Sequence, residues 1–226
     1  MCPPASSTSA SLSTEVKGAS VPDCVPSDPV SQAAYTYAAQ HLQPTILNHS
    51  IRVYLYAKAI NEREGSSWTA EQGRLSLLFT ACILHDIGTT SEHDGPQRFE
   101  VEGGDAAAAV LRKYDVPEED VHEVWVAIAL HTSPGIAERI STLARLVRLA
   151  VAIDFKRPAA MAFTFDAEVE EIERQFSRTD IERVLGDAVA DQGLRQPEKA
   201  PAATWPGVLA RSAKENPGWE GVNRAF

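Results

Sequence analysis

Cysteine is scarce in this chain. The 226 residues include three cysteines, Cys2, Cys24 and Cys82, and no two of them form a CxxC pair. This spacing argues against a zinc site built from thiolates, and the odd number argues against a framework of disulfide bonds. We therefore expect the protein to work in a reducing compartment.

Clusters of basic side chains are also missing. The chain has 21 Lys and Arg against 31 Asp and Glu, which gives a net charge of −10. Phosphate backbones are bound by clustered Lys and Arg, so the composition argues against a nucleic-acid partner.

Long apolar runs are absent as well. No stretch approaches the roughly 20 apolar residues that cross a bilayer. The amino terminus, MCPPASSTSASLSTEVKG, lacks a basic segment followed by an apolar one, which a secretory signal would show. We expect a cytoplasmic protein with no membrane partner.

Strand-like alternation of apolar and polar residues is not sustained anywhere, and the large side chains recur at helical spacing instead, as in Ile46, Val53 and Ile60. The sequence therefore predicts an all-α fold, an irregular helical bundle. Residues 1–26 are rich in Ser and Pro and have few large apolar side chains, so we expect a flexible tail there. Residues 27–226 are expected to form a single helical domain.

Capping signals mark three of the predicted helix starts. They are Ser27 or Asp28 ahead of Pro29, and the capping boxes of Thr69 with Gln72 and of Thr179 with Glu182. The second of these helices is expected to run to Gly88. Further helices are predicted within residues 44–65, 99–116, 116–134 and 141–158.

Histidines and carboxylates lie inside or at the end of these apolar helices. His85 and Asp86 follow the run ACIL, His49 belongs to an earlier helix and Asp154 to a later one. A buried carboxylate without a partner is costly, so a shared divalent ion would relieve the burial of all four side chains. Such a site would keep positions open for water, as catalytic metal sites do.

These residues resemble the HD-domain metalloenzymes, whose pattern is a histidine, an adjacent His-Asp pair and a distant aspartate. The resemblance covers about residues 44–157, through NHSIRVY, LHDIG and LARLVRLAVAIDF. It implies an HD-type helical bundle and a divalent metal held by His49, His85, Asp86 and Asp154.

Within that superfamily the chain is similar to the cyanamide hydratase subgroup, at NHSIRVYLYA, LHDIGTT and RFEVEGGDAA. The resemblance implies a metal-dependent hydro-lyase that adds water to a small nitrile, with cyanamide converted to urea. Zinc is the expected metal, with Fe²⁺ or Mn²⁺ as alternatives, and metal-bound hydroxide would attack the nitrile carbon.

Other members of the superfamily supply the alternatives. An HD phosphohydrolase acting on a nucleotide or another phosphate ester is the main one, but such enzymes often have a lysine after HDIG, where this chain has Thr89. Threonine and the acidic net charge favour a small uncharged substrate. An iron-dependent oxygenase and a binding module without catalysis are weaker alternatives.

Four further side chains are candidates for catalysis. Thr89 and His131 would support the developing charge or donate a proton, and Glu100 would position the substrate or the metal-bound water. Arg52, one turn after His49, would bind an anion at the site, although pairing with a nearby carboxylate is the alternative interpretation. We expect one metal, a small-molecule substrate and, as a further possibility, a homodimer.

Overall fold

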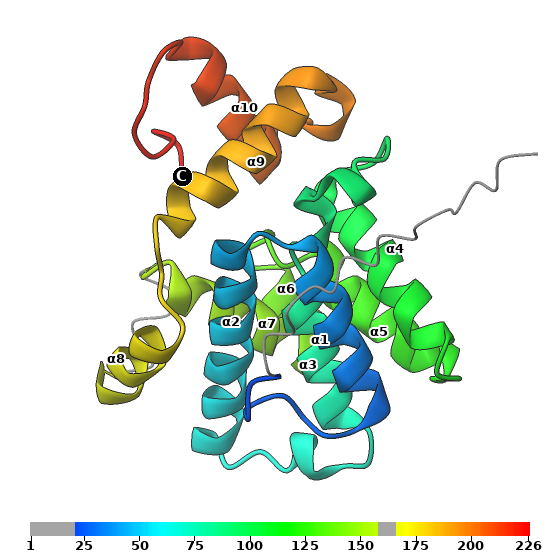
Figure 1. Cartoon of the computed structure of the whole chain (residues 1–226). Helices are drawn as coiled ribbons and strands as arrows, with labels where there is room; N and C mark the ends of the chain where they lie inside the picture. The colour runs from blue at the N-terminus through cyan, green and yellow to red at the C-terminus, as the bar shows by residue number, and fades with distance from the viewer. Residues whose placement is uncertain (1–20, 158–165) are drawn as a thin grey trace, which may run out of the picture.

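Helices account for the regular structure of residues 21–157 and 166–226, which are the residues that this computed structural model describes (Figure 1). No strand occurs among them, and the predicted all-α fold is confirmed. The α-helices are α1 Pro29–His41, α2 Pro44–Arg63, α3 Arg74–Leu84, α4 Phe99–Arg112, α5 Glu118–Ala129, α6 Ala137–Ile140, α7 Thr142–Asp154, α8 Asp166–Gln175, α9 Ile181–Arg195 and α10 Trp205–Glu215. Short 3₁₀ turns are η1 Trp68–Ala70, η2 Ile87–Thr89, η3 Ser91–His93 and η5 Pro197–Lys199.

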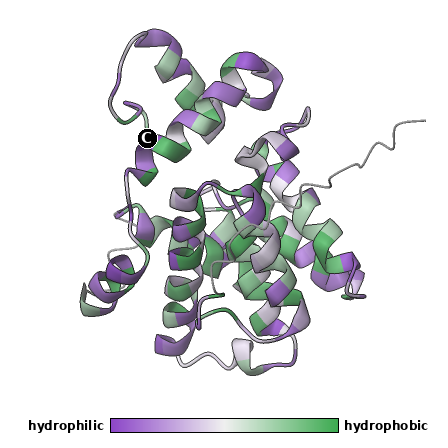
Figure 2. Cartoon of the chain, viewed as in Figure 1, coloured by the Kyte–Doolittle hydropathy of each residue, from purple (hydrophilic) through white to green (hydrophobic). Residues whose placement is uncertain are grey.

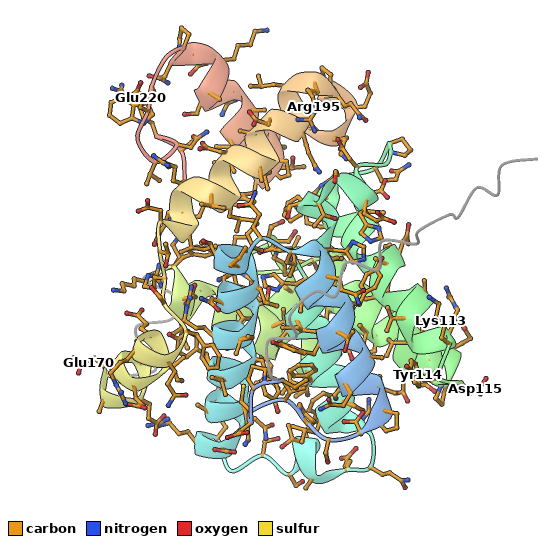
Figure 3. All side chains as sticks on the ribbon, viewed as in Figure 1. Lys113, Tyr114, Asp115, Glu170, Arg195 and Glu220 are labelled. Atoms are coloured by element: carbon orange, nitrogen blue, oxygen red, sulfur yellow. The ribbon has the colours of Figure 1, made fainter. Side chains whose placement is uncertain are left out.

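Helix α2 is the centre of the bundle. It packs against α3 on one side and α7 on another, while α4 and α5 pack on each other and α9 pairs with α10 at one end of the molecule (Figure 1). Apolar residues concentrate on the inward faces of the bundle, whereas α8 is largely hydrophilic (Figure 2). Figure 3 shows polar side chains such as Lys113, Asp115 and Glu170 at the periphery. Within the described ranges, no helix combines the length and the hydropathy needed to span a membrane.

The first helix begins as its capping signal predicts. The Asp28 carboxylate accepts a hydrogen bond from the backbone N–H of Ser31 at 2.9 Å, and Pro29 occupies the first turn. Residues 21–26, expected to belong to the flexible tail, lead into this cap, and Val25 packs in the core. Residues 1–20 of the predicted tail lie outside the described residues.

Both capping boxes predicted from the sequence are wrong. Helix α3 begins at Arg74 rather than Thr69, after Gly73 in a left-handed conformation with φ of +80°. The Thr69 hydroxyl instead accepts a hydrogen bond from the Asn61 amide at 2.8 Å, a contact with the end of α2. Helix α9 begins at Ile181, one residue later than a cap at Thr179 would place it. An N-cap residue has an extended backbone, whereas Thr179 has a positive φ of 33°.

A close approach of α4 to the turn after α3 explains the glycine of LHDIG. A Cβ atom at Gly88 would lie 2.0 Å from the carbonyl oxygen of Phe99 and 2.9 Å from the backbone nitrogen of Gly103. Gly103 in turn faces the carbonyl oxygen of His85, 3.2 Å from where its own Cβ would be. Only glycine at residue 88 lets the two backbones meet, and this contact sets the position of the turn that follows His85.

We predict that Gly88→Ala destabilises the protein by about 3 kcal/mol or more, because backbone atoms cannot move aside as a flexible side chain can. Gly65→Ala is the matched comparison, since Gly65 has a positive φ of 63° but no neighbouring group within 4 Å of the place that a methyl would take. Its cost should be about 1–2 kcal/mol, the strain of a left-handed residue. Chemical denaturation of both variants measures the difference, and equal losses would contradict the close approach.

Candidate metal centre

The predicted metal ligands come from three helices. His49 lies in the second turn of α2, His85 follows the last residue of α3, Asp86 comes next in the chain, and Asp154 is the last residue of α7. All four side chains are buried. The helix ends at His85 and Asp154 allow these side chains to turn toward α2 from two directions.

Hydrogen bonds at Nδ1 determine which ring nitrogen of each histidine carries the proton. His49 Nδ1 lies 2.7 Å from Asp154 Oδ2, and His85 Nδ1 lies 2.7 Å from the carbonyl oxygen of Cys82. Because an ionised carboxylate and a carbonyl only accept, each Nδ1 must donate. In the neutral rings both Nε2 atoms then present lone pairs, and they are 3.1 Å apart.

Asp86 adds a third acceptor at the same place. Its Oδ2 lies 3.2 Å from His85 Nε2 and 3.4 Å from His49 Nε2, and neither carboxylate oxygen receives a hydrogen bond although both are buried. Burial raises the pKa of Asp86, but protons on the surrounding imidazoles outweigh this effect and hold the pKa well below its usual value, and a cation at the same place would act in the same direction. Unpaired buried acceptors are costly, so the arrangement fits a cation.

The chemistry of the three donors also fits a metal. The donor atoms of His49, His85 and Asp86 lie within 4.8 Å of one another, close enough to share one ion. Two imidazoles and a carboxylate suit zinc and other first-row divalent metals. Three protein ligands would also leave a coordination position open, as in catalytic zinc sites.

Asp154 lies behind His49 instead of beside the converging acceptors. Arg52 donates to both of its oxygens, from Nε to Oδ1 at 2.7 Å and from Nη2 to Oδ2 at 2.9 Å. Burial raises the pKa of Asp154, but Arg52 and His49 outweigh it and keep the carboxyl ionised. A carboxylate that accepts from the second nitrogen of a ligand histidine orients the ring and increases its basicity.

Arg52 does not line the cavity. Its Nη1 donates to the carbonyl oxygens of Phe176 and Ser177, at 3.0 and 2.9 Å, and its side chain is fully buried. The geometry thus matches the alternative interpretation, in which Arg52 pairs with a carboxylate. It also ties α2 to the segment between α8 and α9.

His131 lies at the edge of the acceptor cluster, which consists of His49, His85 and Asp86. It follows the end of α5, and its Nδ1 lies 2.7 Å from the carbonyl oxygen of Ile128, the same three-residue relation as between His85 and Cys82. Its Nε2 therefore also presents a lone pair, 3.5 Å from Asp86 Oδ1. His131 borders the cavity next to the three converging donors.

Glu100 does not border the cavity but contacts a side chain that does. It is fully buried at the start of α4, where it accepts from Arg98 at 2.6 Å and from the Thr132 hydroxyl at 2.7 Å. Thr132 itself borders the cavity. Thr132 was not among the residues predicted from the sequence, although its place directly after His131 in LHTSP was an available signal.

Thr89 does not border the cavity formed around His49 and Asp86. Its hydroxyl donates to the backbone carbonyl of Asp86 at 2.7 Å, within the short turn η2. The contact stabilises the turn that carries Asp86, so the structure gives Thr89 a positioning contact in place of the predicted contact with substrate.

The acceptor cluster opens into a cavity of about 340 Å³. Its far wall comes from the end of α7, from α9 and α10, and from the last residues of the chain, which return to the start of α9 (Figure 1). Aromatic rings dominate this wall: Phe155 lies 5.0 Å from Phe226, and Trp205 lies 5.5 Å from Phe226, between ring centroids. Aromatic rings thus form one wall of the cavity beside the metal centre.

The comparison with known families agrees with this geometry. The family model described as HD domain matches residues 46–155, which include the histidine, the His-Asp pair and the distant aspartate. This chain contains an HD domain.

Two yeast proteins resemble this HD domain protein over a longer stretch. They are cyanamide hydratase DDI2 and cyanamide hydratase DDI3 of Saccharomyces cerevisiae, each 29% identical over 132 residues. The matched stretch covers 57% of this chain and 57% of each yeast protein. An enzyme of the HD type is therefore supported, and the buried donors His49, His85 and Asp86 are its candidate site for a divalent metal.

We predict different metal losses in two variants. His85→Ala should lose the metal, because one of three converging donors is gone. Asp154→Asn should keep it with roughly 10- to 100-fold weaker affinity, the usual effect of removing the partner of a ligand histidine. Competition with a chromophoric zinc chelator measures both affinities.

His122→Ala is the matched control, because His122 is exposed and stacks on Trp125 away from the cluster. Its zinc affinity should equal that of the wild type. If the folded Asp154→Asn variant binds no more zinc than His85→Ala does, Asp154 is a direct ligand. The assignment of Asp154 as the hydrogen-bond partner of His49 is then wrong.

Proposed function

We propose that this HD domain protein is a metal-dependent hydratase that adds water to the nitrile of a small molecule, with cyanamide converted to urea as the reference reaction. The observation that carries the proposal is the convergence of three buried acceptors, on His49, His85 and Asp86, at the base of a cavity. The names of the two yeast relatives support the choice of substrate.

The proposed ligands are His49, His85 and Asp86, holding one divalent ion. We propose zinc, because it accepts two imidazoles and a carboxylate and tolerates an open position, with Fe²⁺ and Mn²⁺ as metals to compare. When bound, such an ion lowers the pKa of a coordinated water to about 7. A nucleophile is then available near neutral pH.

His131 is proposed to move the proton. Hydration forms a C–O bond, breaks one π bond of the nitrile and transfers a proton from water to the nitrile nitrogen. His131 Nε2 presents a lone pair, because Nδ1 is held by the Ile128 carbonyl. It can take the proton of the attacking water and return it to the nitrogen, which gives the isourea form that tautomerises to urea.

Thr132 and the aromatic wall are proposed to orient the substrate. The Thr132 hydroxyl donates to Glu100, so its oxygen lone pairs remain available to accept from the amino group of cyanamide. Glu100 thereby acts through Thr132. Phe155, Trp205 and Phe226 exclude bulk water from the cavity, which strengthens the polar contacts inside it.

We predict that zinc-loaded protein forms urea from cyanamide and that His131→Ala lowers kcat by roughly 10²- to 10⁴-fold, the usual contribution of a general base. The variant should keep its zinc, because the three proposed ligands remain. A coupled urea assay with elemental analysis of the same samples measures both quantities, and His122→Ala serves again as the control.

Absence of urea from a fully zinc-loaded wild type would contradict the hydratase proposal. Release of phosphate from a panel of phosphate monoesters under the same conditions would then favour the HD phosphohydrolase alternative. Full activity of His131→Ala, with urea formed by the wild type, would leave the hydratase intact and remove His131 from the mechanism.

A further inference from the structure

Two arginines line the same cavity as the acceptor cluster. Arg148 lies on α7, fewer than two turns before Asp154, and Arg157 follows the end of that helix. Arg148 Nη1 donates to the backbone carbonyl oxygen of His131 at 3.2 Å, so this guanidinium contacts the main chain of the residue that carries the proposed base. The cavity therefore has a metal centre and two cationic groups in one enclosure.

Carboxylates do not fully compensate these two charges. Glu138 Oε1 lies 3.5 Å from Arg148 Nε, too far for a hydrogen bond, and Nε is buried with no hydrogen-bond partner. The other oxygen of Glu138 accepts from the backbone N–H of Gly135 at 2.6 Å. Arg157 makes no ion pair with any residue in the described ranges. Within the described ranges, Glu138 is thus the carboxylate that pairs with Arg148, and Arg157 has no such partner.

The two guanidinium groups are close enough to affect each other. Burial lowers the pKa of Arg148, Glu138 opposes this effect, and the positive charge of Arg157 lowers the pKa further. Two like charges at a partly dehydrated wall repel each other unless an anion comes between them. The wall around Arg148 and Arg157 is therefore suited to an anionic ligand.

Arg157 also keeps its hydrogen-bond donors available. Its guanidinium carbon lies 5.7 Å from the centroid of the Phe226 ring. A cation–π contact uses the face of the guanidinium group, whereas its N–H groups lie in the plane. The aromatic ring thus holds the side chain in place without occupying the donors that would bind a carboxylate or a phosphate.

We infer that the natural substrate carries an anionic oxyacid group, a carboxylate or a phosphate, that binds between Arg148 and Arg157 while its reactive group lies at the acceptor cluster. The inference rests on the proposed function for the reactive group. Cyanamide has only a nitrile and an amino group, and it would leave this part of a cavity of about 340 Å³ unused. Thr89 and the acidic net charge led us to expect an uncharged substrate. The two arginines favour a charged substrate instead.

Isothermal titration of inorganic phosphate, and separately of acetate, into the zinc-loaded full chain tests the site directly. We expect phosphate, acetate or both to bind, and Arg157→Gln to weaken that binding by at least about tenfold, the loss expected for charge-assisted hydrogen bonds. The tighter of the two anions identifies the group that the natural substrate carries. Arg157→Lys, which keeps the charge and loses the planar donors, should fall between the wild type and Arg157→Gln.

Arg145→Gln is the matched control on the same helix. Arg145 pairs with Glu64 at 2.6 Å, outside the cavity, so its removal should not change anion binding. Equal affinity of the wild type and Arg157→Gln would place the anion on the metal alone and overturn the inference, as would the absence of binding by both anions.

The urea assay separates this inference from the proposed function. Urea formation from cyanamide without anion binding leaves the hydratase standing and rejects the anionic subsite. Arginine-dependent anion binding without urea formation keeps the subsite and rejects the nitrile as the reactive group. A nitrile with a carboxylate, cyanoacetate, should be hydrated with a higher kcat/KM than cyanamide if both proposals hold.

Discussion

Three acceptor atoms, on His49, His85 and Asp86, converge inside this bundle at a point that one cation could occupy. The Nδ1 atoms of His49 and His85 donate to Asp154 and to the Cys82 carbonyl, which leaves both Nε2 atoms as acceptors beside Asp86. Water cannot reach this point freely, so the repulsion among the acceptors is relieved only by a cation or an extra proton. The need for a cation connects the fold of the HD domain to its chemistry.

The support for that cluster extends into the rest of the fold. Asp154 carries its charge between His49 and Arg52, and Arg52 donates in turn to the carbonyl groups after α8. Breaking a buried ion pair leaves an uncompensated charge, which is strongly destabilising. The helices α2 and α7 and the segment before α9 are therefore joined through the same interaction that orients a proposed metal ligand. The α9–α10 pair forms part of the far wall of the cavity that this ligand borders.

Local signals in the sequence were reliable where no distant group competed with them. Asp28 caps α1 as expected, because the capping hydrogen bond forms within one turn. The capping signal at Thr69 failed, because that hydroxyl is used by Asn61 of another helix. The Thr89 hydroxyl donates to the Asp86 carbonyl within the short turn η2, a contact that the sequence did not predict. At Thr69 and Thr89 the hydroxyl has a hydrogen-bond partner that spacing alone does not reveal.

The sequence by itself determined that the chain is helical and that His49, His85 and Asp86 would be buried, because they lie in or directly after strongly apolar helical stretches. Tertiary structure alone decided that Asp154 stands behind His49, since its partner Arg52 lies about a hundred positions away in the chain. It alone brought Arg148 and Arg157 to the wall that Trp205 and Phe226 also line. Periodicity describes one helix at a time, whereas the shape and charge of a cavity depend on how several helices pack.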